Sequence, residues 1–225
     1  MNVGIIVAAG KSERMGPKVD KAFLSLGTKP VLAYPLIAFE KCPDIDGIVL
    51  EVRKDRIEAA YGVAHMFGCS KLIRVVAGGA KRQTSVANGM ACLDDDVTLV
   101  SIHDGGRPCL TPELISETIK AAKRYGSGVA AAKITDTVKY VEKGYRVTRT
   151  VDRSKLWAVQ TPQTFKRDLL FEAFQALSKK HVTVTDDASA VELVCDEVRL
   201  VPSTMPNIKI TTADDLAVAA ALMKL

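Results

Sequence analysis

The sequence predicts an α/β protein with a mostly parallel sheet, and three observations support this prediction. Short apolar segments alternate with helix-like segments along most of the 225 residues. The first apolar segment, Val3–Ala8, is apolar throughout, as expected for a strand buried on both faces. Helix-start and helix-stop residues stand where the segments change, as in Thr111-Pro112-Glu113 and Gly126. Alternation of this kind is typical of helices packed on both faces of a parallel sheet.

The predicted elements follow one another in a regular order. The predicted strands are Val3–Ala8, Gly47–Val52, Leu72–Val76, Val97–Ile102, Gly128–Ile134 and Val198–Val201. The predicted helices are Val31–Glu40, Asp55–Met66, Arg82–Cys92, Thr111–Tyr125, Arg167–Leu177, Asp187–Val194 and Thr212–Met223. Ile208–Ile210 is predicted as a short extended piece.

Several elements carry their own boundary signals. Pro35 either kinks the first helix or marks its late start. Gly78-Gly79 ends the third strand, and the last helix opens on Thr212 with acids at the positive end of the helix dipole.

The alternation stops between about Thr135 and Phe165. Val138–Val141 and Tyr145–Val151 are β-rich and flank Glu142-Lys143-Gly144, which is typical of a hairpin turn. We therefore predict one domain, residues 1–225, with a projecting β-arm inserted at about 135–165.

The composition excludes several classes of protein. With 48% hydrophobic and 25% charged residues, the chain is close to the globular average, which argues against disorder and coiled coil. No apolar run approaches the roughly 18–20 residues of a membrane span, and no basic stretch precedes the first run as in a secretory signal. Aromatic residues make up only 5%, so surfaces that stack nucleic-acid bases are not expected. We expect neither a membrane nor a nucleic acid as partner.

Cysteines and net charge add weaker constraints. The five cysteines are irregularly spaced and form no CxxC motif, so we expect reduced thiols in a cytoplasmic protein. The formal net charge of +5 suits small anionic ligands without selecting among them.

The loop after the first strand begins with small residues and continues with basic ones. Ala8-Ala9-Gly10 lets main-chain N–H groups approach an anion closely. Four cations follow within eleven positions: Lys11, Arg14, Lys18 and Lys21. This combination suits a triphosphate, although a solvated basic loop is the alternative. Gly10-Lys11-Ser12 resembles the end of a Walker A motif, but Ile5 stands where that motif needs glycine, and no GxGxxG is present.

Two further strand ends carry loops suited to ligands. Gly78-Gly79 precedes a helix start, which is a potential anion site, although a plain turn with Ser85 as a polar helix residue fits the spacing equally well. In the third loop, Asp104 can hold a sugar hydroxyl or Mg²⁺, and Arg107 can bind a phosphate with two hydrogen bonds. An Asx-type turn with a surface arginine is the alternative. Ligands of such sheets bind at the carboxyl ends of strands, so we expect one cleft.

Other chemically interesting residues have structural alternatives. His103 has no evident triad partner, and we expect it, His65 and His181 to be structural. Asp186-Asp187 is a candidate acid pair, yet the same residues make an ordinary helix N-terminus. Lys209 is either an edge lysine or a side chain that points into a cleft.

Taken in order, these loops resemble those of one family, the 2-C-methyl-D-erythritol 4-phosphate cytidylyltransferases of the non-mevalonate isoprenoid pathway. The resemblance covers nearly the whole chain, and the motifs are far more specific together than singly. They are Ala8-Ala9-Gly10 with Arg14-Met15 and a later lysine, Gly78-Gly79-x-x-Arg82-x-x-Ser85-Val86, His103-Asp104-x-x-Arg107-Pro108, Asp136-Thr137-x-Lys139, Thr161-Pro162-Gln163, Thr185-Asp186-x-Ala188-Ser189, and Asn207-Ile208-Lys209-Ile210-Thr211.

The resemblance implies a fold and a reaction. The fold is a Rossmann-like sheet of the nucleotide-diphospho-sugar transferase type. The reaction transfers CMP from CTP to methylerythritol phosphate, giving 4-diphosphocytidyl-2-C-methyl-D-erythritol and pyrophosphate, with Mg²⁺ bound mainly through the CTP phosphates. It also implies a homodimer joined by the β-arm, which lends Thr137 and Arg153 to the partner subunit's site.

The resemblance implies roles for individual residues. The implied nucleotide-binding residues are Ala8, Ala9, Gly10, Gly79, Ser85 and Asp104. The implied catalytic residues are Arg14, Lys21, Arg153 and Lys209. The implied substrate-binding residues are Asp104, Arg107, Thr137, Arg153, Thr161, Thr185 and Lys209. Their types suit the chemistry, because an anionic phosphate nucleophile needs cations to position it and not a strong base.

The chain departs from the family pattern in three places. Ser12 stands where many members have a second glycine, and Gly105-Gly106 replaces the usual alanines. The basic loop offers both Lys18 and Lys21 as the catalytic lysine, and we choose Lys21 because it precedes Ala22-Phe23-Leu24. Ribitol 5-phosphate cytidylyltransferase, which shares the nucleotide half, is the closest alternative enzyme, and a non-catalytic nucleotide sensor is the alternative of another class.

Overall fold

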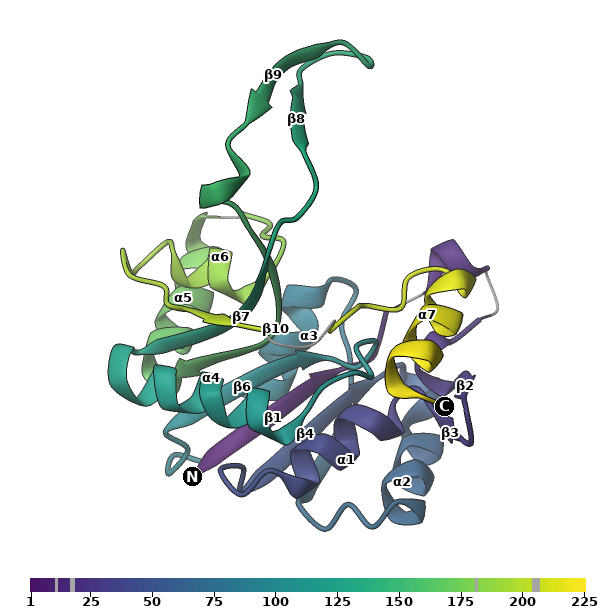
Figure 1. The fold of residues 1–225 in the computed structure, drawn as a ribbon. Helices are drawn as coiled ribbons and strands as arrows, with labels where there is room; N and C mark the ends of the chain where they lie inside the picture. Colours follow the sequence, from purple (N-terminus) through teal and green to yellow (C-terminus); the bar gives the residue numbers. More distant parts are fainter. Residues whose placement is uncertain (11, 17–18, 181, 204–206) are drawn as a thin grey trace.

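A seven-stranded sheet forms the centre of the molecule (Figure 1). The structure, a computed structural model, describes residues 1–10, 12–16, 19–180, 182–203 and 207–225. The strand order is β11-β7-β10-β6-β1-β4-β5. The strands are β1 (Asn2–Val7), β4 (Gly47–Val52), β5 (Leu72–Ala77), β6 (Leu99–Asp104), β7 (Ser127–Lys133), β10 (Trp157–Lys166) and β11 (Leu200–Pro202). Only β10 is antiparallel to its neighbours within this described sheet, which confirms a mostly parallel sheet.

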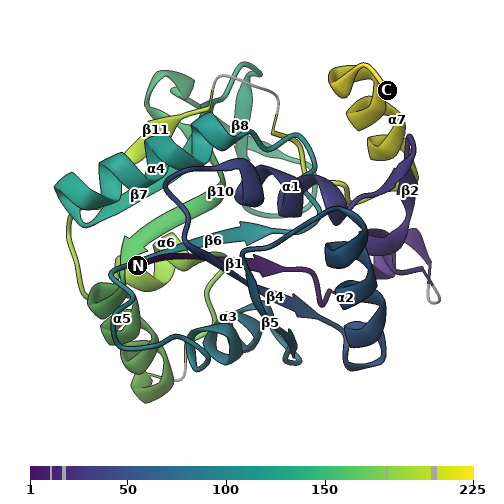
Figure 2. The ribbon, with the colours of Figure 1, turned by 90° about the horizontal axis from the view of Figure 1, so that it is seen from below.

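Helices cover both faces of the sheet (Figure 2). They are α1 (Ala33–Lys41), α2 (Ile57–Met66), α3 (Arg82–Met90), α4 (Pro112–Tyr125), α5 (Arg167–Lys180), α6 (Asp187–Val191) and α7 (Ala213–Met223). Helices α1, α2 and α4 pack on one face and α3, α5 and α6 on the other, while α7 lies beside the small hairpin of β2 (Ser25–Leu26) and β3 (Lys29–Pro30). None of the helices in the described ranges has both the length and the apolar character needed to cross a membrane.

Strand β1 supplies apolar side chains to both faces because successive strand residues point in opposite directions. Ile6 packs in one cluster with Phe39 of α1, and Ile5 packs in the other with Phe165 of β10. All four side chains are fully buried. Burial of a side chain of this size contributes about 1.5–3 kcal/mol, so the two clusters hold the strands in place below the loops at their carboxyl ends.

Most predicted elements are present, with ends shifted by up to three residues. Pro35 lies in the first turn of α1, so it marks a late start and not a kink. The Thr111 side chain accepts a hydrogen bond from the N–H of Leu114, and Gly126 ends α4 with a φ of 90°. These are the predicted caps.

The hairpin within the predicted arm is present. Strands β8 (Val138–Val141) and β9 (Val147–Val151) pair antiparallel and project from the rest of the molecule (Figure 1). The exposed residues there include Tyr140 and Tyr145. A two-stranded hairpin of this kind is marginally stable by itself.

Two expectations differ from the structure. The arm is shorter than residues 135–165, because β10 turns back into the central sheet and pairs with β6 and β7. Residues 208–210 form no strand. Instead, the N–H of Ile210 donates to the carbonyl oxygen of Gly106 at 2.8 Å, which ties this segment to the loop after β6.

Candidate functional site

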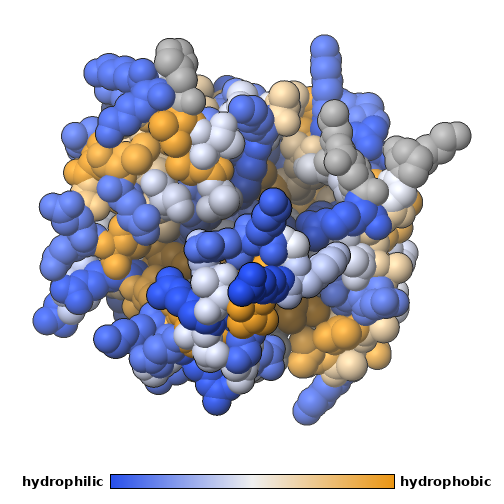
Figure 3. All heavy atoms as spheres, turned by 90° about the horizontal axis from the view of Figure 1, so that it is seen from above, coloured by the Kyte–Doolittle hydropathy of each residue, from blue (hydrophilic) through white to orange (hydrophobic). Residues whose placement is uncertain are grey.

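Two adjoining cavities open where the central strands end. The larger, of about 790 Å³, is enclosed by the loops after β1, β4, β5 and β6. The smaller, of about 330 Å³, lies between β10 and the start of α6. Arg82, Asp104 and Lys209 line both cavities, so the two spaces meet at these side chains. Figure 3 views the molecule from the side of the β-arm, where hydrophilic side chains predominate and recessed surface is visible between them.

Most of the predicted site residues line these cavities. Those in the larger cavity are Ala8, Ala9, Gly10, Lys21, Gly79, Ser85, Asp104 and Lys209. Those in the smaller cavity are Asp104, Arg107, Thr161, Thr185 and Lys209. Arg14, Thr137 and Arg153 line neither of the two.

Glycines allow the loops of the larger cavity to touch. A Cβ added at Gly78 would lie 2.2 Å from the Cβ of Ala9, and one at Gly105 would lie 2.8 Å from the Cβ of Ala8. Both distances are shorter than a normal contact, so with the loops placed as they are here a Cβ at either position would force the loop after β1 to move. The loops after β5 and β6 therefore close against the loop after β1 and form a wall of small residues, which a ligand can approach closely.

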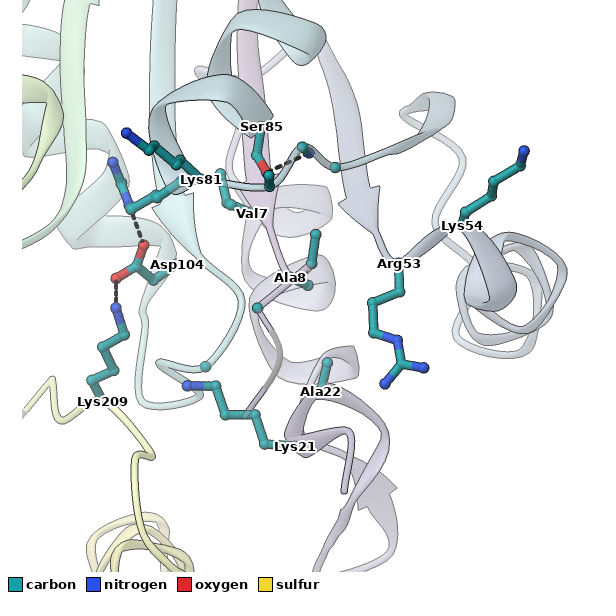
Figure 4. Close-up of a pocket in the computed structure, with 17 residues that line it drawn as sticks. Val7, Ala8, Lys21, Ala22, Arg53, Lys54, Lys81, Ser85, Asp104 and Lys209 are labelled. Carbon is teal, nitrogen blue, oxygen red and sulfur yellow. Dashed lines mark hydrogen bonds and ion pairs between the residues drawn. The ribbon is translucent and has the colours of Figure 1, made fainter. Parts of the chain in front are cut away.

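Ser85 links α3 to the loop after β5. Its side chain is buried, and its Oγ accepts a hydrogen bond from the N–H of Gly79 at 3.0 Å (Figure 4). The serine thus holds Gly79 at the cavity wall.

The larger cavity is strongly basic. The cationic side chains on its described lining are Lys21, Arg53, Lys54, Lys81, Arg82 and Lys209. Asp104 is the only acid among the described residues that line it. Such an excess of positive charge suits a polyphosphate.

Lys21 reaches into the larger cavity from the short helix η2 (Lys21–Phe23). Its Nζ donates to the carbonyl oxygen of Ile210 at 2.9 Å. Its main-chain N–H donates to the Oγ of Ser12 at 3.2 Å. Burial, followed by the nearby charge of Lys209, lowers the pKa of Lys21. The other candidate lysine, Lys18, lies outside the described residues, as does Lys11.

The remainder of the first loop clarifies two features of the sequence. Ser12 has a φ of 54°, the left-handed region that glycine occupies without cost, which explains why a glycine fits this position. Arg14, in the short helix η1 (Glu13–Met15), is exposed. Its charge also lowers the pKa of Lys21, so Arg14 lies near the larger cavity without lining it.

Asp104 is the centre of a buried charge cluster at the end of β6. Its Oδ1 accepts from the Nε of Arg82 at 3.0 Å, and its Oδ2 accepts from the Nζ of Lys209 at 2.6 Å. The Nε of Arg107 lies 3.9 Å from the same Oδ2. Burial by itself would raise the pKa of Asp104, but these cations outweigh it and hold the pKa well below its usual range. Lys209 therefore points into the cleft and is not an edge lysine (Figure 4).

A chain of hydrogen bonds supports the smaller cavity. The Oγ1 of Thr161 accepts from the N–H of Asp104 at 3.0 Å and lies 3.1 Å from the Nδ1 of His103. The Nε2 of His103 lies 3.1 Å from the carbonyl oxygen of Arg107, so the ring donates there and accepts from Thr161. Burial lowers the pKa of His103 to about 4, which keeps the ring neutral. His103 is therefore structural, as expected.

The paired acids have separate structural partners. Asp186 is the N-cap of α6, and its carboxylate accepts from the N–H of Ser189. Asp187 is fully buried, and its Oδ2 accepts from the Nη2 of Arg82 at 2.7 Å. Gln163 of β10 accepts from the main-chain N–H of Asp187 and donates to the side chain of Asp186. The pair is thus a bonded helix N-terminus, which holds the exposed Thr185 at the rim of the smaller cavity.

The two predicted arm residues lie apart from both cavities of their own chain. Thr137 precedes β8, and Arg153 lies in the short helix η4 (Arg153–Lys155) after β9. Both are exposed. The guanidinium of Arg153 donates to the carbonyl oxygen of Thr135 at the base of the arm.

Sequence reasoning assigned no individual role to several residues of the site. Arg82 stands within a quoted motif, yet its contacts with Asp104 and Asp187 join residues far apart in the sequence. Arg53 and Lys54 follow β4 and line the larger cavity. Because both residues follow a predicted buried strand, their place in the sequence could have identified them as candidate site residues.

The α/β fold carries a basic cavity beside a second, smaller cavity at the carboxyl ends of the central strands, an arrangement that suits an enzyme of the nucleotidyltransferase class. The sequence profile of a family described as 2-C-methyl-D-erythritol 4-phosphate cytidylyltransferase matches residues 2–225. The chain belongs to this family.

Individual relatives agree with this assignment. A relative of that name from Desulforamulus reducens is 43% identical over 226 residues, covering 99% of this chain and 95% of its own length. Another from Alkaliphilus oremlandii is 39% identical over 221 residues, covering 98% of this chain and 94% of its own. A crystal structure of a 4-diphosphocytidyl-2C-methyl-D-erythritol synthase from Anaerococcus prevotii is 30% identical with a TM-score of 0.88, covering 100% of this chain and 96% of that one.

Proposed function

We propose that this chain transfers CMP from CTP to 2-C-methyl-D-erythritol 4-phosphate, giving 4-diphosphocytidyl-2-C-methyl-D-erythritol and pyrophosphate in the non-mevalonate isoprenoid pathway. The observation that carries the proposal is the junction of the two cavities at Asp104 and Lys209. A nucleotide in the larger cavity and a polyol phosphate in the smaller would meet there. Family membership supports the identity of both substrates.

The step is a displacement at the α-phosphorus of CTP. An oxygen of the polyol phosphate forms a bond to this phosphorus, while the bond to the bridging oxygen of the β-phosphate breaks and pyrophosphate leaves. The nucleophile is already anionic, so the protein has to bring two anions together and stabilise the charge of the transition state. Lys21 and Lys209 lie on the cavity lining where they can do so.

The other residues have supporting roles in this proposal. Ala8, Ala9, Gly10, Gly79 and Ser85 form the nucleotide wall, and Arg14 reaches the triphosphate from outside the cavity lining. Asp104 contacts substrate hydroxyl groups, while Arg107, Thr161 and Thr185 line the polyol side. Arg107 suits a phosphate because its guanidinium presents several donors in one plane.

Mg²⁺ is the cofactor that we propose. The described residues contain no cluster of three or more His, Cys, Asp or Glu side chains that would hold a metal ion. Asp104 is the only described acid on the lining of the nucleotide cavity, and both of its oxygens already accept from cations. This donor set fits an ion bound mainly through the CTP phosphates, as Mg²⁺ commonly is. When bound, it would neutralise part of the triphosphate charge.

We further propose that the β-arm joins two subunits, so that Thr137 and Arg153 act in the partner subunit's site. Both residues lie outside the cavities of their own chain, and the exposed two-stranded hairpin lacks a core of its own. The cytoplasm remains our predicted location.

Pyrophosphate release tests the reaction. The assay contains CTP, Mg²⁺ and either methylerythritol phosphate or ribitol 5-phosphate, with the purified chain. We expect turnover with methylerythritol phosphate. Turnover with ribitol 5-phosphate alone would overturn the choice of acceptor, and CTP binding without turnover on either acceptor would favour a nucleotide sensor.

A further inference from the structure

Arg82 connects three parts of the site that are distant in the sequence. It is the first residue of α3, and its guanidinium bridges Asp104 at the end of β6 and Asp187 at the start of α6. The side chains of Asp104 and Asp187 are 10% and 1% exposed, whereas that of Arg82 is 25% exposed. Arg82 is therefore held from the protein side by two buried carboxylates while part of it faces the cavities.

We propose that Arg82 is a positioning residue that holds Asp104 as a correctly oriented anion for binding of the polyol phosphate. The Nε of Arg82 donates to Oδ1 of Asp104, and the Nζ of Lys209 donates to Oδ2. With one cation on each oxygen, the plane of the carboxylate is fixed. Each oxygen still has capacity to accept from a substrate hydroxyl group.

Only an arginine suits this position. Its Nε and Nη2 donate in different directions, to carboxylates that belong to different elements. A lysine carries the same charge but is a point donor without a rigid fork, so it cannot fix both carboxylates in the same way. Asp187 is in turn anchored through its main-chain N–H, which donates to Gln163 at 3.1 Å.

The charges around Asp104 come from every element packed against it. The cationic groups are Arg82 from α3, Lys209 from the C-terminal segment, Arg107 from its own loop and Lys21 from η2. The other titratable neighbours are Asp187 from α6 and the neutral ring of His103 on β6. After burial, Arg82 is the strongest influence on Asp104, and it lowers the pKa. Removal of Arg82 should raise the pKa of Asp104, because a nearby opposite charge favours the ionised carboxylate.

This inference rests on the proposed function for the identity of the acceptor. The test compares Arg82→Gln with Arg82→Lys in the pyrophosphate-release assay at a fixed pH near neutrality, with each substrate varied in turn. Arg124→Gln, which removes a cation outside both cavities, controls for net charge. The double variant Arg82→Gln/Asp187→Asn removes both partners of one ion pair, so it avoids an unpaired buried acid if Arg82→Gln folds poorly.

We expect Arg82→Gln, alone or in the double variant, to raise KM for the polyol phosphate at least tenfold and KM for CTP less than threefold. Arg82→Lys should raise the same KM as well, because it keeps the charge and loses the geometry. Equal rises in both KM values would overturn the inference.

Carbon-13 NMR titration of the Asp104 carboxyl group provides a readout that needs no substrate. Its resonance is assigned with Asp104→Asn. The pKa of Asp104 should be higher in Arg82→Gln than in the wild type, and an unchanged value would contradict the inference. Failure of the proposed function would instead appear as absence of pyrophosphate release by the wild-type chain, so the two failures are distinguishable.

Discussion

The Nζ of Lys21 lies 2.9 Å from the carbonyl oxygen of Ile210, and this hydrogen bond joins the loop after β1 to the segment that carries Lys209. The two lysines thus reach the same cavity from opposite ends of the sequence (Figure 4). Burial and the charge of Lys209 lower the pKa of Lys21. Bound phosphate groups would stabilise both ammonium groups, because an opposite charge favours the charged form.

Lys21→Ala should lower kcat/KM by about 10²-fold or more, because it removes a cation that stabilises the transition state. Steady-state pyrophosphate release measures the effect. Lys41→Ala, which removes an exposed lysine at the end of α1, is the control. If Lys21→Ala keeps wild-type turnover, the assignment is wrong and Lys18 is the residue to test.

Gly78→Ala should weaken CTP binding and lower the melting temperature. The added Cβ would lie 2.2 Å from the Cβ of Ala9, so the loop after β1 has to move. Overpacking of this kind costs about 1–3 kcal/mol. Calorimetry of CTP binding and thermal unfolding measure both effects. Gly62→Ala in α2, where an added Cβ meets no atom within 4 Å, is the matched control and should not lower the melting temperature.

His103 should make the fold less stable in acid. Burial lowers its pKa in the folded state to about 4, below the value of 6.5 for an exposed histidine. The unfolded chain therefore binds the proton first, and stability is lost as the pH falls from about 6.5 to about 4. The loss is up to about 3 kcal/mol. Urea unfolding at several pH values should show this dependence in the wild type and a weaker one in His103→Asn. Equal dependence in both proteins would contradict the prediction.

Glu51 should have the opposite dependence on pH. Its side chain is fully buried, and burial, reinforced by Asp187, raises its pKa to about 8. The folded state therefore holds a proton that the unfolded chain releases near pH 4.5, so stability is lost as the pH rises from about 4.5 to about 8. Glu51→Gln should remove this loss, which amounts to up to about 4 kcal/mol. A variant that is less stable than the wild type at pH 8.5 would count against this account.

Mixed dimers should test whether the β-arm acts across subunits. On this proposal, Lys21→Ala inactivates the site of the subunit that carries it. Arg153→Ala instead inactivates the site of the partner subunit, to which the arm contributes Arg153. In a mixed dimer, one site then carries both defects and the other carries neither. Coexpression should therefore recover about a quarter of wild-type turnover if the three dimers form statistically. If Arg153 serves its own subunit, or if the chain is monomeric, no recovery should occur.

Some features of the site followed from local sequence. The loop after β1, Gly78-Gly79 and Asp104 were predicted at strand ends because a buried strand followed by small and charged residues is a local signal. The caps of α4 were predicted for the same reason. Strand β10 was not predicted, because its antiparallel pairing with β6 and β7 is a long-range property that interrupts the alternation.

The α/β class, the order of most elements and the loops that carry the charged residues could be predicted from local sequence, because hydrophobic periodicity and turn chemistry act between near neighbours. The bridge from Arg82 to Asp104 and Asp187 could be recognised only in the folded chain. The tertiary structure also showed that Lys209 faces Asp104 across a sequence separation of 105 residues. Such contacts depend on how the strand ends converge, since a pair of opposite charges has no signature in sequence spacing. The net charge of the chain is only +5, but folding brings several cationic side chains together in one cavity at the carboxyl edge of the sheet.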